Sequence, residues 1–127
     1  MKKMSAVRVA LAAGILTAAL AGCGDDGAEE PIDFSAGQAA AGEVIYSARC
    51  AACHGADGYG TAVGPPLVHE IYRPGHHSDI AFQLAIRTGV RPHHWGFGAM
   101  PAIPGLSNKD IADIVAYVRM LQEDAGI

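Results

Sequence analysis

The feature that most constrains this chain of 127 residues is the pentapeptide Cys50-Ala51-Ala52-Cys53-His54. The C-x-x-C-H spacing is the one used for covalent attachment of a c-type haem, where each thiol forms a thioether with a vinyl group. The adjacent residue, His54, is then held beneath the ring, where an imidazole nitrogen can bind the iron. We therefore expect the rest of the chain to supply a dry pocket and a sixth iron ligand.

Two other kinds of site use closely spaced cysteines, a redox dithiol and one half of a zinc site. A redox dithiol is expected in a βαβ context, and the sequence shows no strand pattern. A zinc site would need a second ligand pair at similar spacing, but no cysteine follows Cys53. Haem attachment is therefore the favoured interpretation of the motif.

The first 22 residues have the layout of a secretory signal, because a basic start precedes an apolar run at residues 9–21. This run is shorter than the ~20 residues that a membrane-spanning helix needs. Leu20-Ala21-Gly22-Cys23 looks like a bacterial lipobox, which predicts a lipoprotein signal peptide at 1–22 and a lipidated Cys23. The alternatives are an ordinary signal peptide with a chance cysteine, or an uncleaved anchor.

Acidic residues dominate the predicted mature protein. The full chain has nine Lys and Arg against thirteen Asp and Glu, a formal net charge of −4. Cleavage before Cys23 would leave six against thirteen, or −7, which argues against nucleic acid as a partner. Residues 23–34 are acidic at their start and lack an apolar pattern, so they are predicted to be a flexible tether. Residues 35–127 then form one domain.

The first of three expected main helices is predicted to begin at Ser35. Ser35 and Gln38 have the spacing of a capping box, in which two side chains satisfy free N–H groups at a helix start. Gly42, Tyr46 and Cys50 follow at intervals of four, so they share one face of the helix.

The second helix is predicted to start at Ser78 and to stop at Gly89, and the third to open with a capping box of Ser107 and Asp110. The stripes expected to be buried are Ile80, Ala81, Leu84 and Ala85 in the second helix, and Ile111, Ile114, Val115, Val118 and Leu121 in the third.

From about Gly37 to Leu121 the chain resembles the small single-haem class I cytochromes c. The matching pieces are Gly42-x-x-x-Tyr46-x-x-x-Cys50, Cys53-His54-Gly55, Gly64-Pro65-Pro66-Leu67, Trp95 to Met100-Pro101, and Ile114-Val115-Ala116-Tyr117. The resemblance implies an all-α, small cytochrome c fold, with three main helices plus loops wrapped around one covalent haem c. It also implies that the glycine and aromatic residue of the first helix pack at a crossing with the last.

Met100 is the candidate for the sixth iron ligand. Only two methionines follow the predicted signal peptide, and Met120 belongs to the last helix, whereas Met100 lies in a loop. A soft thioether favours ferrous iron, so a His/Met pair raises the reduction potential and suits electron transfer. A methionine that merely packs in the loop is the alternative.

The resemblance also implies roles for Pro65 and Trp95. Pro65 matches a family proline whose carbonyl accepts the Nδ1 proton of the iron-bound histidine and so orients the ring. Trp95 matches a tryptophan that donates its indole N–H to a haem propionate. A rigid turn at Pro65 and an aromatic wall at Trp95 are the plainer interpretations.

Two histidine pairs, His76-His77 and His93-His94, are less usual for this family. We favour contact with haem propionates or placement on the surface, because adjacent residues rarely both face one site. The alternatives are a second metal site, since four imidazoles suit copper or zinc, and replacement of Met100 on the iron by His93 or His94.

The predicted function is one-electron transfer by a carrier that is not itself an enzyme. We expect a lipid-anchored protein in the periplasm or on the outer face of the cytoplasmic membrane. Its donor would be a quinol-oxidising complex or a dehydrogenase, and its acceptor a terminal oxidase or reductase. The alternatives are a haem-based sensor or small peroxidase with a labile sixth ligand, and a fixed cytochrome subunit of a larger reductase or oxidase.

Overall fold

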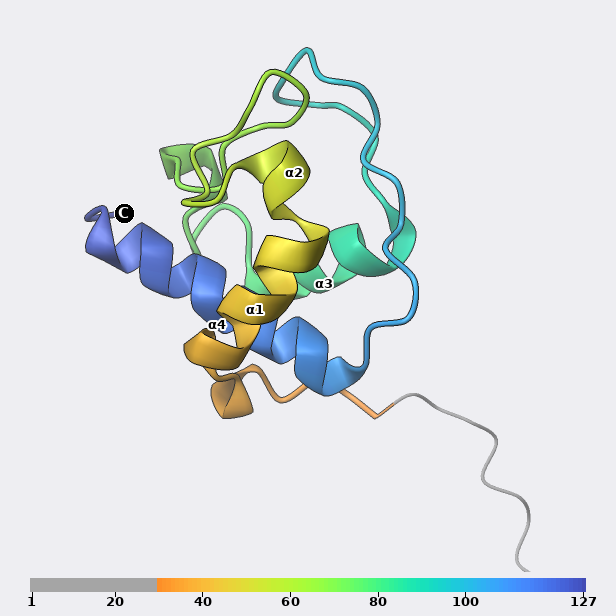
Figure 1. The fold of residues 1–127 in the computed structure, drawn as a ribbon, viewed down its shortest axis with the longest axis vertical. Coiled ribbons are helices and arrows are strands. Elements are labelled where there is room, and N and C mark those ends of the chain that lie inside the picture. Colours follow the sequence, from red (N-terminus) through yellow and green to blue (C-terminus); the bar gives the residue numbers. More distant parts are fainter. Residues whose placement is uncertain (1–29) are drawn as a thin grey trace, which may run out of the picture.

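The computed structural model describes residues 30–127, and helices joined by long loops make up this part of the chain (Figure 1). The α-helices are α1 (Ala39–Arg49), α2 (Ala51–His54), α3 (Asp79–Thr88) and α4 (Asn108–Asp124), and two 3-10 helices are η1 (Phe34–Ala36) and η2 (Glu70–Tyr72). The β-type pairing within residues 30–127 is one isolated bridge, between Val90 and Met100. The predicted all-α fold with three main helices is confirmed, and α2 adds a short fourth helix.

The predicted signal peptide at 1–22, the predicted lipid site at Cys23 and tether residues up to 29 lie outside the described residues. The last part of the expected tether, residues 30–34, belongs to the folded domain. Ile32 and Phe34 pack against the core, and the side-chain amide of Asn108 donates to the carbonyl of Glu30 at 2.7 Å. No helix between residues 30 and 127 is long and apolar enough to span a bilayer.

The first α-helix begins at Ala39, so the prediction that it starts at Ser35 is wrong. Ser35 lies instead in η1, where its N–H and hydroxyl both donate to the carboxylate of Asp33, at 3.0 and 2.6 Å. The N–H of Gln38, at the true start of α1, donates to Oδ1 of Asp113 in α4 at 2.8 Å. A tertiary contact therefore satisfies the helix end that the sequence pattern assigned to a local capping box.

Helices α1 and α4 cross at Gly42 (Figure 1). A Cβ atom at Gly42 would come within 1.9 Å of the carbonyl oxygen of Asp113, so only glycine permits this approach. One turn further on, Tyr46 is fully buried with its ring 5.2 Å from that of Tyr117. Its hydroxyl donates to the carbonyl of Gly55 at 2.9 Å. The shared face of Gly42 and Tyr46 thus joins the crossing to the turn that follows the cysteine motif.

Replacing Gly42 by alanine should lower the stability of the protein. In a solvent-exposed helix this change would add ~1 kcal/mol of stability, because alanine is the better helix former. At the crossing, the added methyl group must push two backbones apart, and overpacking of this kind costs about 1–3 kcal/mol. Urea denaturation of the haem-loaded protein, followed by circular dichroism, measures the difference.

The matched control for that change is Gly75→Ala. Gly75 lies in a loop, and a Cβ atom there meets nothing within 4 Å. The free energy of unfolding of the Gly75→Ala protein should therefore differ from that of the wild type by no more than ~0.5 kcal/mol. If Gly42→Ala were as stable as Gly75→Ala, or more stable than the wild type, the close crossing of α1 and α4 would be wrong.

Helix α4 follows its sequence prediction closely. The capping box is present, with Ser107 and Asp110 exchanging hydrogen bonds between side chain and backbone. The predicted stripe is confirmed, since Ile111, Ile114, Val115 and Val118 are buried and Leu121 packs against the same core. This helix is the support on which the other elements are assembled.

Helix α3 departs from its prediction. Ser78 occupies the N-cap position without a side-chain capping bond, and Gly89 ends the helix at φ 76°. The predicted buried stripe is wrong in part, because Ile80 and Leu84 are 58% and 54% exposed, whereas Ile86 is buried. Leu84 borders a cavity on a side of α3 that does not pack against α4, which explains its exposure.

Candidate haem-binding site

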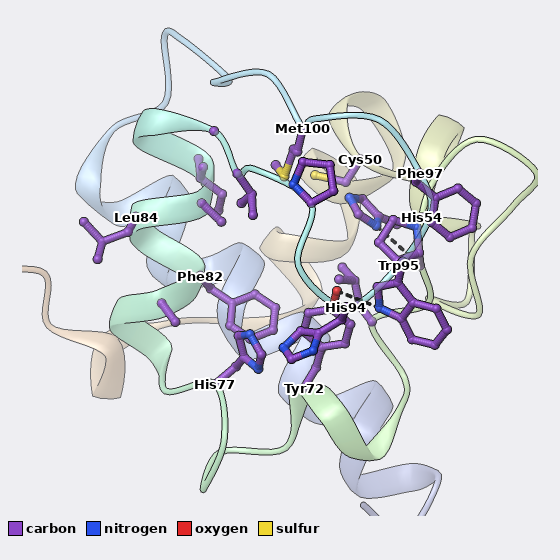
Figure 2. Close-up of a pocket in the computed structure, with 18 of the residues that line it drawn as sticks. Cys50, His54, Tyr72, His77, Phe82, Leu84, His94, Trp95, Phe97 and Met100 are labelled. Atoms are coloured by element: carbon purple, nitrogen blue, oxygen red, sulfur yellow. Dashed lines mark hydrogen bonds between the residues drawn. The ribbon is translucent and has the colours of Figure 1, made fainter.

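A cavity of ≈ 400 Å³ lies between α3, the cysteine motif and the loop that leads to Met100 (Figure 2). Most of its wall is apolar, with side chains from Leu67, Ala81, Phe82, Leu84, Ala85, Ile86, Val90, Phe97, Ile114 and Val118. Cys50, His54, Pro65, Trp95 and Met100 border the same cavity, so the fold gathers five of the six predicted haem-contacting residues. The sixth, Cys53, is exposed in α2.

His54 is the last residue of α2 and is buried. Its Nδ1 lies 2.9 Å from the carbonyl oxygen of Pro65, and because a carbonyl can only accept, Nδ1 donates. Among residues 30–127, Nε2 of His54 has no hydrogen-bond partner, so it is the nitrogen left for a ligand. Gly64 allows this contact, since a Cβ atom there would lie 2.6 Å from the carbonyl oxygen of Cys53.

The two motif cysteines have different surroundings. Cys50 joins α1 to α2 and borders the cavity, and burial raises the pKa of its thiol to about 11. Cys53 lies three residues later on the exposed side of α2. Neither cysteine is in a disulfide, so both sulfurs are free for thioether bonds.

Met100 is held in place by the end of α3. Its backbone exchanges two hydrogen bonds with Val90, each 3.0 Å long. Gly89 permits this contact, because a Cβ atom there would lie 2.5 Å from the carbonyl oxygen of Met100. Sequence reasoning identified Gly89 only as the residue that ends α3. Nothing in the sequence indicated that the next residue, Val90, pairs with Met100.

Trp95 borders the cavity from the loop before Met100, and its indole N–H donates to the hydroxyl of Tyr72 at 3.2 Å. Tyr72 also lines the cavity, and burial raises the pKa of its hydroxyl. Sequence reasoning did not select Tyr72, and its one signal was an aromatic residue between the glycine- and proline-rich loop and α3.

Comparison with known proteins decides what this site belongs to. Residues 39–122, about two thirds of the chain, match the family model for cytochrome c. The chain belongs to the cytochrome c family. The sequence-based resemblance to a class I c-type cytochrome is confirmed.

Individual relatives of this cytochrome agree. Cytochrome c-554(547) of Halothiobacillus neapolitanus is 33% identical over 92 residues, covering 68% of this chain and 100% of the relative. Cytochrome c-554(548) of Halomonas halodenitrificans is 41% identical over 85 residues, covering 65% and 94%. The structure of cytochrome c6 from the diatom Phaeodactylum tricornutum is 31% identical, with a TM-score of 0.51 over 69% of this chain and 98% of that one.

The cytochrome is therefore a haem electron carrier whose cofactor is covalently attached haem c, and its partners are redox proteins. The residues present fit that group. Cys50 and Cys53 lie in the haem-binding region beside His54, whose Nε2 is unpartnered in the described chain, and the wall between them and Met100 is apolar.

A partly buried arginine that sequence reasoning missed anchors one wall of the cytochrome's cavity. Arg119 of α4 forms an ion pair with Asp79 at 2.8 Å. It also donates to the carbonyl oxygens of Tyr72, at 2.7 Å, and His77, at 2.6 Å. Its guanidinium lies 4.7 Å from the ring centre of Phe82, which lines the cavity. The only sequence signal was a cation beside the apolar stripe of α4.

The two histidine pairs of the cytochrome come together. The rings of His76 and His77 are 4.9 Å apart, and that of His94 lies 5.4 and 5.3 Å from them. The ring of His93 is 4.3 Å from His94. The argument that adjacent histidines rarely face one site was therefore wrong here, because the turn before α3 meets the loop before Met100.

Proposed function

We propose that Cys50 and Cys53 hold the haem through two thioethers and that His54 and Met100 are its axial iron ligands. The observation that carries this proposal is the bond from Nδ1 of His54 to Pro65, which leaves Nε2 available beside the cavity that Met100 also borders. Haem iron supplies a one-electron couple between its ferric and ferrous states. The chain's own residues determine the reduction potential of that couple and which redox partners can approach the haem.

Each residue has a distinct task in this proposal. Pro65 fixes the tautomer and orientation of His54 and makes it a stronger donor. Met100 fills the sixth position, which favours ferrous iron and keeps small ligands out. Trp95 and Tyr72, already linked by a hydrogen bond, offer polar hydrogens at the cavity wall to the haem propionates. The apolar lining excludes water, so little solvent reorganises when the charge changes.

We further infer that the cytochrome is a carrier without catalytic activity, anchored by lipid at Cys23 in the periplasm or on the outer face of the cytoplasmic membrane. The support is the basic start, apolar run and lipobox-like Leu20-Ala21-Gly22-Cys23. A quinol-oxidising complex or dehydrogenase would reduce it, and a terminal oxidase or reductase would oxidise it. The excess of acidic residues suits brief, salt-sensitive encounters with such partners.

Membranes from bacteria that express the chain test this function. In washed wild-type membranes, the haem should become reduced when a respiratory substrate is added and become oxidised again when the terminal acceptor is supplied. In cells with Cys23→Ser, the haem protein should be released to the soluble fraction or misprocessed, because serine has no thiol to carry the lipid whose several acyl chains would anchor the protein firmly. Difference spectra of the two fractions provide the measurement.

Haem staining after denaturing electrophoresis is the control, since Cys23→Ser should still carry haem. Mass spectrometry of the mature N-terminus must find a lipid-modified Cys23. An unmodified Cys23 or cleavage elsewhere would disprove the anchor. A membrane-bound haem that no respiratory substrate can reduce would disprove the carrier role.

A further inference from the structure

We propose that His76, His77 and His94 form a second metal site, which binds one divalent ion of the zinc and copper class beside the haem pocket. One ligating nitrogen from each ring lies within 4.8 Å of the other two, and no acidic side chain is part of the group. Imidazole is a preferred ligand for zinc, copper and nickel, whereas calcium and magnesium need oxygen.

The distances are close to those a bound ion requires. Nitrogens that each lie ~2.05 Å from a tetrahedral zinc are ~3.4 Å apart. Because the three nitrogens already lie within 4.8 Å of one another, no pair has to approach by more than ~1.4 Å. His76 and His94 are exposed and can adjust by side-chain rotation. Three imidazoles leave a fourth position for water, or for the neighbouring His93, whose ring lies 4.3 Å from that of His94.

His77 is already oriented as a metal ligand. Its Nδ1 lies 2.7 Å from the carbonyl oxygen of Ile71, and since a carbonyl only accepts, Nδ1 carries the proton and Nε2 keeps its lone pair. Histidines that bind metals commonly donate their other ring N–H in this way. The carbonyl of His77 accepts from the partly buried Arg119 at 2.6 Å, so the backbone beneath the ring is held by α4.

The site lies at the edge of the haem pocket and not at its iron-binding centre. His77 and His94 border the cavity, whereas His76 does not. In Figure 2, His77 and Tyr72 lie on the side of the cavity away from Met100 and Cys50. The two loops that carry the histidines both belong to the pocket wall, so a metal ion there would fasten the turn before α3 to the loop before Met100.

Zinc binding to the full haem-loaded cytochrome, purified without a histidine tag, tests the proposal. After equilibrium dialysis against a weak zinc chelator, elemental analysis should find one zinc per haem in the wild type. His76→Gln and His94→Gln should each weaken zinc binding by at least about tenfold, since loss of even an outer-shell partner costs roughly 10–100-fold. His69→Gln is the matched control, because His69 is a non-motif histidine outside the three-residue group, and it should retain the zinc.

The haem spectrum shows whether each variant is folded, and all three should keep the wild-type spectrum. Zinc that the weak chelator removes from the wild type would overturn the proposal. Equal zinc retention by His76→Gln, His94→Gln and His69→Gln would do the same. If the first two variants change the haem midpoint potential in zinc-free buffer while the wild type retains no zinc, the imidazoles serve the haem propionates instead.

Discussion

A chain in which Cys50 and Cys53 are both replaced by serine should carry no covalently attached haem and should fail to reach a stable fold. Serine hydroxyls do not form the thioether bonds that the C-x-x-C-H motif supports. Haem staining after denaturing electrophoresis should show the signal of the wild type at full strength and none for the double variant. The expected effect is all or none, because no other described residue is a cysteine.

The physical reason for the loss of stability is the cavity itself. Its ≈ 400 Å³ is lined by side chains from α1, α3, α4 and the loops that follow α2 and α3, so a haem bound there would form a large share of the domain's apolar core. Removing a ligand that binds only the folded state removes its whole binding free energy from folding. Circular dichroism should therefore show a large loss of helix in the double variant.

Cys23→Ser is the matched control, because it changes a cysteine to serine outside the motif. It should keep haem staining and helix content even when the protein is no longer held by the membrane. Wild-type protein that is purified with zinc and without haem absorbance would contradict the whole assignment of the site, and so would full haem staining of the double variant.

The residues of the C-x-x-C-H motif could be selected from the sequence because the motif is local. Cys50, Cys53 and His54 lie within five residues, and a four-residue helix is enough to set their relative positions. Pro65 and Met100, also selected from the sequence, both border the cavity, but the contacts that position them were not predicted. Those contacts are backbone approaches permitted by Gly64 and Gly89, and a sequence shows that a glycine is present without showing which backbone comes near it.

Errors in the helix predictions have a similar cause. The spacing of Ser35 and Gln38 fits a local cap, but Asp113, far along the chain, takes the N–H of Gln38 instead. In α3, periodicity assumed that every apolar residue faces protein, whereas Leu84 borders the cavity. Sequence patterns therefore predicted the helices that pack against other helices. They failed where a residue borders the cavity, or where its hydrogen-bond partner lies far along the chain.

Met100→Ala should open the iron, lower the midpoint potential and slow electron exchange. Met100 borders the cavity on a backbone fixed by two hydrogen bonds to Val90, so no other described methionine can take its place. Loss of the thioether removes the preference for ferrous iron, and a fall on the order of 0.1 V is expected where axial ligands span ~0.8 V. The far-red absorption band of the ferric iron–thioether bond should disappear, and carbon monoxide should bind the ferrous form readily.

Met120→Ala is the matched control, since Met120 is 38% exposed on α4 and does not line the cavity. Its spectrum, potential and resistance to carbon monoxide should equal those of the wild type. A wild-type protein that is high-spin and binds carbon monoxide readily would instead identify a sensor or small peroxidase with an open site. If Met100→Ala leaves the spectrum unchanged while His93→Ala or His94→Ala alters it, a histidine is the sixth ligand and the carrier works at low potential. The comparison separates these outcomes because all four variants keep the motif cysteines, so each should still contain its haem.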